Sequence, residues 1–268
     1  MSSLTYVYCL VLNARRPIIP PGLQDVPGGR DVRALAAGDG VWLIVTTVPA
    51  KTYDEAALAK GLQNLDWVGR RALAHEAVVE QFLSSRSILP MQLFTLFTSD
   101  ERALQHVGRQ RNTIVGILKR LERKLEWGLR LTFDEATLRT GIEAKARKAA
   151  GPVPSGAGYL ARKRDLLDVT RGQLSAARTE ANRLFAFLKK EAAESRRRNE
   201  TEQASAGARL LLDAAFLVPT SRTRAFRAAV GRHAKSIGAR GLVVSLTGPW
   251  PPYNFISAGS VDQARGKV

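Results

Sequence analysis

The sequence predicts an α+β protein of two domains, each built from an antiparallel sheet with helices packed on it. Runs of β-branched and aromatic residues alternate with amphipathic helical patterns along the chain. Their order is β-β-α-β-α in the first half and β-α-α-β-α-β in the second. Either order is compatible with a split βαβ, ferredoxin-like layout. We therefore expect an N-terminal domain at residues 1–124, a C-terminal domain at residues 125–257 and a flexible tail at residues 258–268.

The first half contains three candidate strands and three candidate helices, of which the adjacent helices at 55–62 and 66–85 count as one helical element in the order above. Residues 4–12 are apolar or aromatic at both alternating sets of positions, which predicts a strand buried on both faces. A proline- and glycine-rich loop follows, then a turn at residues 36–40, a strand at 41–48 and another at 88–97. Helices are predicted at 55–62 after Asp54 or Thr52, at 66–85 with Asp66 as the capping residue, and at 101–124 after Ser99 or Asp100.

The second half predicts a strand, a long helical arm and a closing β-α-β unit. Residues 126–133 alternate apolar and polar side chains, as a strand with one wet face does. A helix is expected from Asp134 to about residue 149. Leucine or alanine recurs every seven residues from Leu160 to Leu188, which favours a coiled-coil arm or an antiparallel helical hairpin at about residues 156–206. Strands at 210–218 and 241–247 flank a helix at 224–237, and the last strand is expected in the core.

The last strand runs into a block of prolines and aromatic residues, Gly248-Pro249-Trp250-Pro251-Pro252-Tyr253-Asn254-Phe255. Each proline fixes its own φ and pushes the preceding residue toward extended geometry, so the block forms a stiff ribbon that carries three rings. The rings either pin the last strand onto its domain or present an apolar surface to a partner. Packing is the favoured interpretation, because soluble proteins rarely expose three such rings.

The composition limits the functional classes. No apolar run approaches the roughly 20 residues that span a bilayer, and the N-terminus lacks a secretory pattern, so a cytoplasmic location is expected. Cys9 is the only cysteine, which excludes an intrachain disulfide. The formal net charge of +17 predicts attraction to polyanions, anionic surfaces or acidic partners.

The sequence contains none of the catalytic or cofactor motifs that we sought. It has no phosphate-binding GxxxxGK[ST] loop and no strand leading into GxGxxG. The histidines His75, His106 and His233 lie far apart and lack partners at metal-ligand spacing. His75 is interpreted as part of a helix packing face. We therefore expect no enzyme activity, no metal and no cofactor.

Basic residues concentrate on the predicted arm. They are a surface for a polyanion or an acidic partner, or a solvated helix face that nearby acids partly neutralise, and the sequence leaves both interpretations open. The residues concerned are Arg162, Lys163, Arg164, Arg196, Arg197 and Arg198.

Four segments together carry a resemblance to a known family: Tyr6-Val7-Tyr8, His75-Glu76 followed by Leu89-Pro90, Gly156-Ala157-Gly158-Tyr159-Leu160, and the terminal proline-aromatic block. Together they span nearly the whole chain, and in content and order they resemble the gas vesicle protein F/L family. The residues carried over as its structural signature are Tyr6, Tyr8, His75, Pro90, Tyr159, Gly248, Pro249, Trp250, Pro251, Pro252, Tyr253 and Phe255.

This resemblance implies an N-terminal α/β domain and a C-terminal domain with a helical arm. It also implies an accessory or minor component of gas vesicles, without catalytic activity, that binds the hydrophobic major shell protein and prevents its aggregation during nucleation. The other accessory proteins of the vesicle are further expected partners.

An alternative from a different class is a basic protein that binds nucleic acid or an anionic surface. The charge motivates it, although no zinc finger or RRM signature accompanies the charge. Salt distinguishes the two hypotheses, because binding to phosphates weakens steeply as salt rises.

Overall fold

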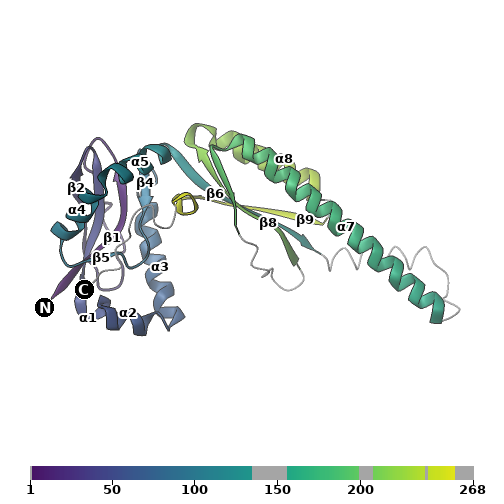
Figure 1. Ribbon diagram of the computed structural model, residues 1–268, viewed down its shortest axis with the longest axis horizontal. Coiled ribbons are helices and arrows are strands. Elements are labelled where there is room, and N and C mark those ends of the chain that lie inside the picture. The colour runs from purple at the N-terminus through teal and green to yellow at the C-terminus, as the bar shows by residue number, and fades with distance from the viewer. Residues whose placement is uncertain (1, 135–155, 199–207, 239–240, 257–268) are drawn as a thin grey trace. The chain divides into compact units, whose positions relative to one another are not determined.

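The computed structural model describes residues 2–134, 156–198, 208–238 and 241–256 (Figure 1). Two compact units make up the chain: Met1–Glu126 together with Pro249–Val268, and Trp127–Gly248. The chain therefore passes from one unit to the other twice. The predicted boundaries placed residues 125–257 in one domain, whereas the described segment Pro249–Ile256 belongs to the first unit. The predicted helix at 134–149 and the tail at 258–268 lie outside the described residues.

A five-stranded sheet forms the centre of the first unit. Its order is β2-β3-β1-β4, and β5 also pairs with β1. The strands are β1 (Ser3–Leu12), β2 (Arg30–Gly38), β3 (Val41–Pro49), β4 (Ser87–Pro90) and β5 (Leu96–Phe97). β1 is buried along almost its whole length, which confirms the strand expected at residues 4–12.

A bulge in β1 changes which of its side chains face one layer of the core. The register against β3 shifts between Val7 and Cys9. As a result Tyr6, Tyr8 and Cys9 all belong to a single core cluster, which also contains Val78 and Val79 of the helix packed there. Two tyrosines and the histidine-bearing helix are thereby brought together.

Five helices surround this sheet within the described part of the first unit. They are α1 (Ala50–Tyr53), α2 (Glu55–Gly61), α3 (Leu65–Glu80), α4 (Asp100–Arg109) and α5 (Arg111–Leu121). The side chain of Asp54 accepts a hydrogen bond from the Ala57 N–H and caps α2, as the sequence predicts. The cap of α3 is Asn64, not Asp66, because the Asn64 side chain accepts from the Trp67 N–H at 3.0 Å.

Four expectations for this half were incomplete. The strand β2 was missed, since its alanine-rich sequence lacks a β-branched run. The strand expected at 88–97 is interrupted between β4 and β5, where Phe94 adopts a φ of 67°. The helix expected at 101–124 breaks at Gln110 into α4 and α5. Helix α3 ends at Glu80 rather than at residue 85.

The second unit is a four-stranded sheet with two helices on one face (Figure 1). The sheet order is β7-β8-β6-β9. Its elements are β6 (Lys124–Asp134), α7 (Gly156–Glu191), β7 (Glu194–Arg197), β8 (Ala208–Pro219), α8 (Thr223–Gly238) and β9 (Leu242–Trp250). Trp127, Leu129, Leu131 and Phe133 of β6 join the core under these helices, while Arg130 is exposed. The predicted alternation of β6 is therefore confirmed from Leu129 to Phe133, whereas Glu126 and Gly128, which were expected on the wet face, are buried.

Two expectations for the second unit were wrong. The arm is one helix that ends at Glu191, so Arg196 and Arg197 lie in strand β7 and not on the arm. The last strand is not a core strand, because β9 lies at the edge of the sheet and its Val243 is 58% exposed. An edge position also explains how Pro249 is tolerated within it.

The fold is thus a mixed α+β structure with two antiparallel sheets, as the sequence predicts; the ferredoxin-like layout of each domain stays a prediction. Within the described ranges, no helix has the length and apolar character needed to cross a membrane.

Candidate functional site

The terminal proline-aromatic block is anchored inside the first unit. After β9 the chain forms a short 3-10 helix, Tyr253–Phe255. Phe255 is fully buried and its carbonyl oxygen accepts a hydrogen bond from the Arg120 guanidinium. Pro251 and Pro252 are also buried, whereas Trp250 and Tyr253 are each 37% exposed. The ribbon is therefore held through its prolines and its last ring, with two rings half-open to solvent.

Two carboxylates hold this block in place. Glu126 is 3% exposed and accepts hydrogen bonds from both the backbone N–H and the side-chain amide of Asn254, the former at 2.9 Å. The hydroxyl of Tyr253 donates to Oε2 of Glu76 at 2.7 Å. The rigid ribbon thus presents donors to acids that come from α3 and from the start of β6.

Burial dominates the electrostatics of this anchor. Desolvation raises the pKa of Glu76, and the hydrogen bond from Tyr253 acts in the opposite direction. Oε1 of Glu76 is buried without a hydrogen-bond partner. The pKa of Tyr253 is also raised, first by burial and then by the neighbouring Glu76 carboxylate. The Tyr253 hydroxyl therefore remains protonated and continues to act as a donor.

His75 lies beside the tyrosines of β1. Its Nδ1 is 2.8 Å from the Tyr6 hydroxyl, and its ring centroid lies 5.4 Å from that of Tyr8. Burial lowers the pKa of His75 to about 4. The imidazole is therefore neutral at physiological pH and can share one hydrogen bond with Tyr6.

Tyr8 completes a second buried network that the sequence did not reveal. Its hydroxyl donates to Oδ1 of Asp25, and the Val26 N–H donates to the same hydroxyl at 3.1 Å. Thr46 donates to the other oxygen of Asp25. Asp25 lies in the proline- and glycine-rich loop, so this network fixes the loop against the sheet. Nothing in the local sequence distinguishes Asp25 from an ordinary turn residue.

A buried arginine was also missed. Arg71 is 6% exposed, and its guanidinium carbon lies 3.6 Å from the centre of the Trp67 ring and 5.4 Å from that of Tyr53. Its spacing of four residues from Trp67 on α3 is the signal that could have found this contact. The stacking explains how a guanidinium is accommodated on the packing face of a helix.

Three further signature residues differ in what the structure shows of them. Pro90 ends β4 opposite Cys9 of β1 and is buried. Tyr159 lies in the first turn of α7, but its side chain is outside the described residues. Gly248 has a φ of 118°, a conformation that favours glycine, immediately before Pro249.

The basic residues singled out on the predicted arm do not form one surface. Lys163 and Arg164 are exposed near the start of α7, and the side chain of Arg162 lies outside the described residues. The tri-arginine segment begins after the other end of α7, about 40 Å further along at the rise of an α-helix. There Arg198 pairs with Asp213, and Arg197 donates to Asn182 at 2.8 Å.

Among the described residues, no group of three or more histidine, cysteine, aspartate or glutamate side chains is arranged to hold a metal ion. Cys9 is a free, fully buried thiol whose pKa is raised by burial. The signature residues that the structure describes serve packing and hydrogen bonding. They define a two-unit α+β scaffold with an anchored terminal segment.

Comparison with known proteins identifies the family of this scaffold. The family model described as gas vesicle synthesis protein GvpL/GvpF matches residues 4–257. Gas vesicle protein L of Streptomyces sp. (strain CB03234) is 30% identical over 264 residues, which cover 97% of this chain and 95% of that protein. The chain therefore belongs to the GvpL/GvpF family of gas vesicle proteins, and this membership associates it with gas vesicles.

Two crystal structures share the fold. GvpF from Anabaena sp. PCC7120 superposes with a TM-score of 0.67 at 17% identity and covers 96% of this chain and 100% of its own. GvpF from Microcystis aeruginosa gives a TM-score of 0.62 at 17% identity, covering 95% and 99%. At this identity the likeness supports the fold alone.

Proposed function

We propose that this chain is a gas vesicle assembly protein, a minor vesicle component that binds the hydrophobic major shell protein and prevents its aggregation during nucleation. The match of the GvpL/GvpF family over residues 4–257 carries the proposal. The protein acts without catalysis, in the cytoplasm and on the growing vesicle, together with other gas vesicle accessory proteins. Such a role needs a soluble protein with an apolar surface that can cover an aggregation-prone subunit.

An apolar surface on the first unit supports this role. Leu65 and Leu73 of α3 are 86% and 75% exposed, and Leu62 just before this helix is 57% exposed. Eight residues separate the two α3 leucines, a little over two helical turns, so they lie along one side of the helix. Large exposed apolar side chains that gather in this way are typical of an interaction surface. We assign this surface to the shell protein.

Coexpression with the major shell protein tests the assignment. We expect the wild-type chain to copurify with the shell protein and to lower the fraction that sediments as aggregate. The double variant Leu65→Ser/Leu73→Ser should lose both effects and keep its fold, since exposed substitutions change stability by about 0.5 kcal/mol or less. Ile18→Ser is the control for an exposed apolar side chain, because Ile18 is 87% exposed in a loop outside α3. Equal capture by all three proteins would refute the assignment, and no capture by the wild type would refute the function.

His75 gives a second test, since we interpret it as a packing residue. Copurification with the shell protein should survive His75→Ala wherever that variant is still folded by circular dichroism. Loss of capture by a folded His75→Ala protein would instead make the imidazole part of the binding site.

The formal charge of +17 motivates the alternative, a protein that binds nucleic acid or an anionic surface. Binding to phosphates should fall about a thousandfold or more between 50 and 200 mM salt if about six or more phosphates are contacted. Apolar capture of the shell protein should not weaken over that range. A pull-down at both salt concentrations therefore separates the two functions.

A further inference from the structure

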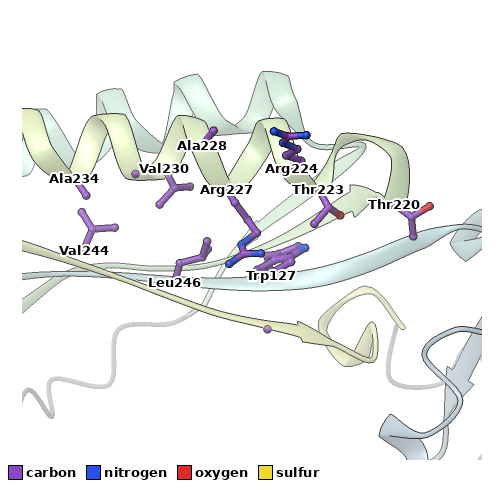
Figure 2. A pocket seen from close by; sticks show the side chains of 12 residues that line it. Trp127, Thr220, Thr223, Arg224, Arg227, Ala228, Val230, Ala234, Val244 and Leu246 are labelled. Carbon is purple, nitrogen blue, oxygen red and sulfur yellow. The ribbon is translucent and has the colours of Figure 1, made fainter.

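A groove of about 800 Å³ lies between helix α8 and strands β6 and β9, wholly within the second unit (Figure 2). Its two ends differ in chemistry. Toward the end of α8 it is lined by Ala234, Val244 and Leu246. Toward the start of α8 it is lined by polar and charged groups, with Arg227 reaching from the helix over the ring of Trp127 (Figure 2). The groove therefore suits a ligand with an apolar part and a polar end.

The polar end contains two buried groups that lack hydrogen-bond partners. Trp127 is only 4% exposed and its Nε1 makes no hydrogen bond; the hydroxyl of Thr223 is buried and equally unsatisfied. Both residues line the groove. A buried donor without an acceptor costs about 1–3 kcal/mol, so an acceptor placed here would be strongly favoured.

The charge at this end is positive. The guanidinium of Arg227 lies 5.6 Å from the centre of the Trp127 ring, and Arg224 stands one turn earlier on the same helix. The first turn of α8 contains no acidic side chain, so the positive end of the helix dipole is not neutralised there. Neither arginine forms an ion pair with a carboxylate in the part of the chain that the structure describes. An indole N–H, a hydroxyl and a guanidinium together form a site for a carboxylate.

Among the described strands, the one that borders the groove has a neighbour on one side only. β9 is the last strand of its sheet, and its burial alternates between half-buried and exposed residues. An extended segment can therefore lie along β9 and direct alternate side chains into the groove. An edge that no described strand covers, next to an apolar floor, favours a polypeptide over a small molecule.

We propose that this groove binds a segment of a partner polypeptide in which apolar side chains precede an acidic one. The carboxylate accepts from Nε1 of Trp127 and pairs with Arg227, while the apolar side chains lie on Val244 and Leu246. Charge complementarity selects this occupant, because the chain carries 41 basic and 24 acidic residues and its groove holds two arginines. The inference that the groove contacts an assembly partner rests on the proposed function. The inference that the groove prefers an acidic segment does not.

The test uses the full chain and a blocked pentapeptide, acetyl-Ala-Leu-Val-Leu-Glu-amide, with the Gln-terminated peptide as its neutral counterpart. The indole N–H signals of the four tryptophans are recorded by ¹⁵N NMR, and Trp127→Phe identifies the signal of Trp127. We expect the Glu peptide to shift the Trp127 signal in a saturable way and to bind at least about tenfold more tightly than the Gln peptide.

The variants localise the contact. Arg227→Gln should weaken binding of the Glu peptide about tenfold and leave binding of the Gln peptide unchanged. Arg232→Gln is the matched control, because Arg232 is exposed on α8 outside the groove lining, and it should bind like the wild type. Equal affinity for the two peptides, wild-type affinity in Arg227→Gln, or an unmoved Trp127 signal would each overturn the proposal.

The two proposals fail separately. If the Glu peptide binds as described while the chain never captures the major shell protein, the groove inference holds and the proposed function is wrong. If the chain captures the shell protein while the peptides bind equally, the function holds and the groove inference is wrong.

Discussion

The anchor of the terminal segment makes a quantitative prediction for Asn254→Ala. The Asn254 side chain donates to Glu126, a carboxylate that is 3% exposed. A hydrogen bond to a charged group contributes about 1.5–3 kcal/mol. The Asn254 backbone N–H, which lies 2.9 Å from the same carboxylate, continues to donate to it in the variant, so Glu126 keeps a hydrogen bond. We therefore expect the lower end, a loss of about 1.5–2 kcal/mol in the free energy of unfolding of the first unit.

The assay is equilibrium urea unfolding read by hydrogen exchange of peptides from β1, which reports the first unit alone. Gln105→Ala is the matched control, because Gln105 lies on α4 of the same unit and its side chain accepts an exposed hydrogen bond from Arg102, and it should change stability by less than about 0.5 kcal/mol. In a Glu126→Gln background the effect of Asn254→Ala should shrink by about 1 kcal/mol. A loss no larger than that of the control, or full additivity with Glu126→Gln, would show that this contact does not hold the segment.

Three further predictions concern the same unit. The pKa of His75 is lowered to about 4, so the neutral imidazole stabilises the fold above pH 6.5 and this stability is lost as the pH falls toward 4. In urea titrations the wild type should lose about 3 kcal/mol more than His75→Gln across that pH range. Parallel stability–pH profiles of the two proteins would contradict the assignment. A Cβ at Gly29 would overlap the hydrogen-bonded carboxylate of Asp25, so Gly29→Ala should cost about 1–3 kcal/mol. Gly69→Ala, in open space on α3, should instead stabilise by about 0.5–1 kcal/mol, and thermal melts that rank the two glycine variants the other way would refute this account. Phe255→Ala empties a fully buried site and should cost about 3–5 kcal/mol by urea unfolding, whereas a loss below about 1 kcal/mol would mean that the ring is not held.

Local sequence was sufficient to predict an element of the fold where one physical signal dominates. The continuous apolar run of β1 and the alternation of β6 each predict a strand, and the side chain of Asp54 predicts the start of α2. These features depend on periodicity or on a side chain that bonds its own backbone three residues later. Neither signal requires knowledge of the rest of the chain.

The remaining features depend on tertiary partners. Strand β2 has weak intrinsic preference and forms because it pairs with β3. The tri-arginine segment resembles a solvated helix end, yet Arg198 lies within bonding distance of Asp213 on β8, and that pairing favours a strand there. Asp25 could not be recognised either, because its partners Tyr8 and Thr46 are 17 and 21 residues away. Such tertiary pairings cannot be predicted from the local pattern of a single sequence.

The terminal block shows how a correct local inference led to a wrong location. The prolines do make a stiff ribbon whose last ring is buried, but its acceptors are Glu76 and Glu126 of the first unit. The second unit is therefore inserted between two parts of the first one. The insertion is compatible with a compact first unit because β6 and β9 are neighbours in their sheet, and Thr247 comes within 3.5 Å of the Gly128 carbonyl. Where entry and exit strands pair, the ends of a long insertion are already close together, so completing the first unit requires little further loss of chain entropy.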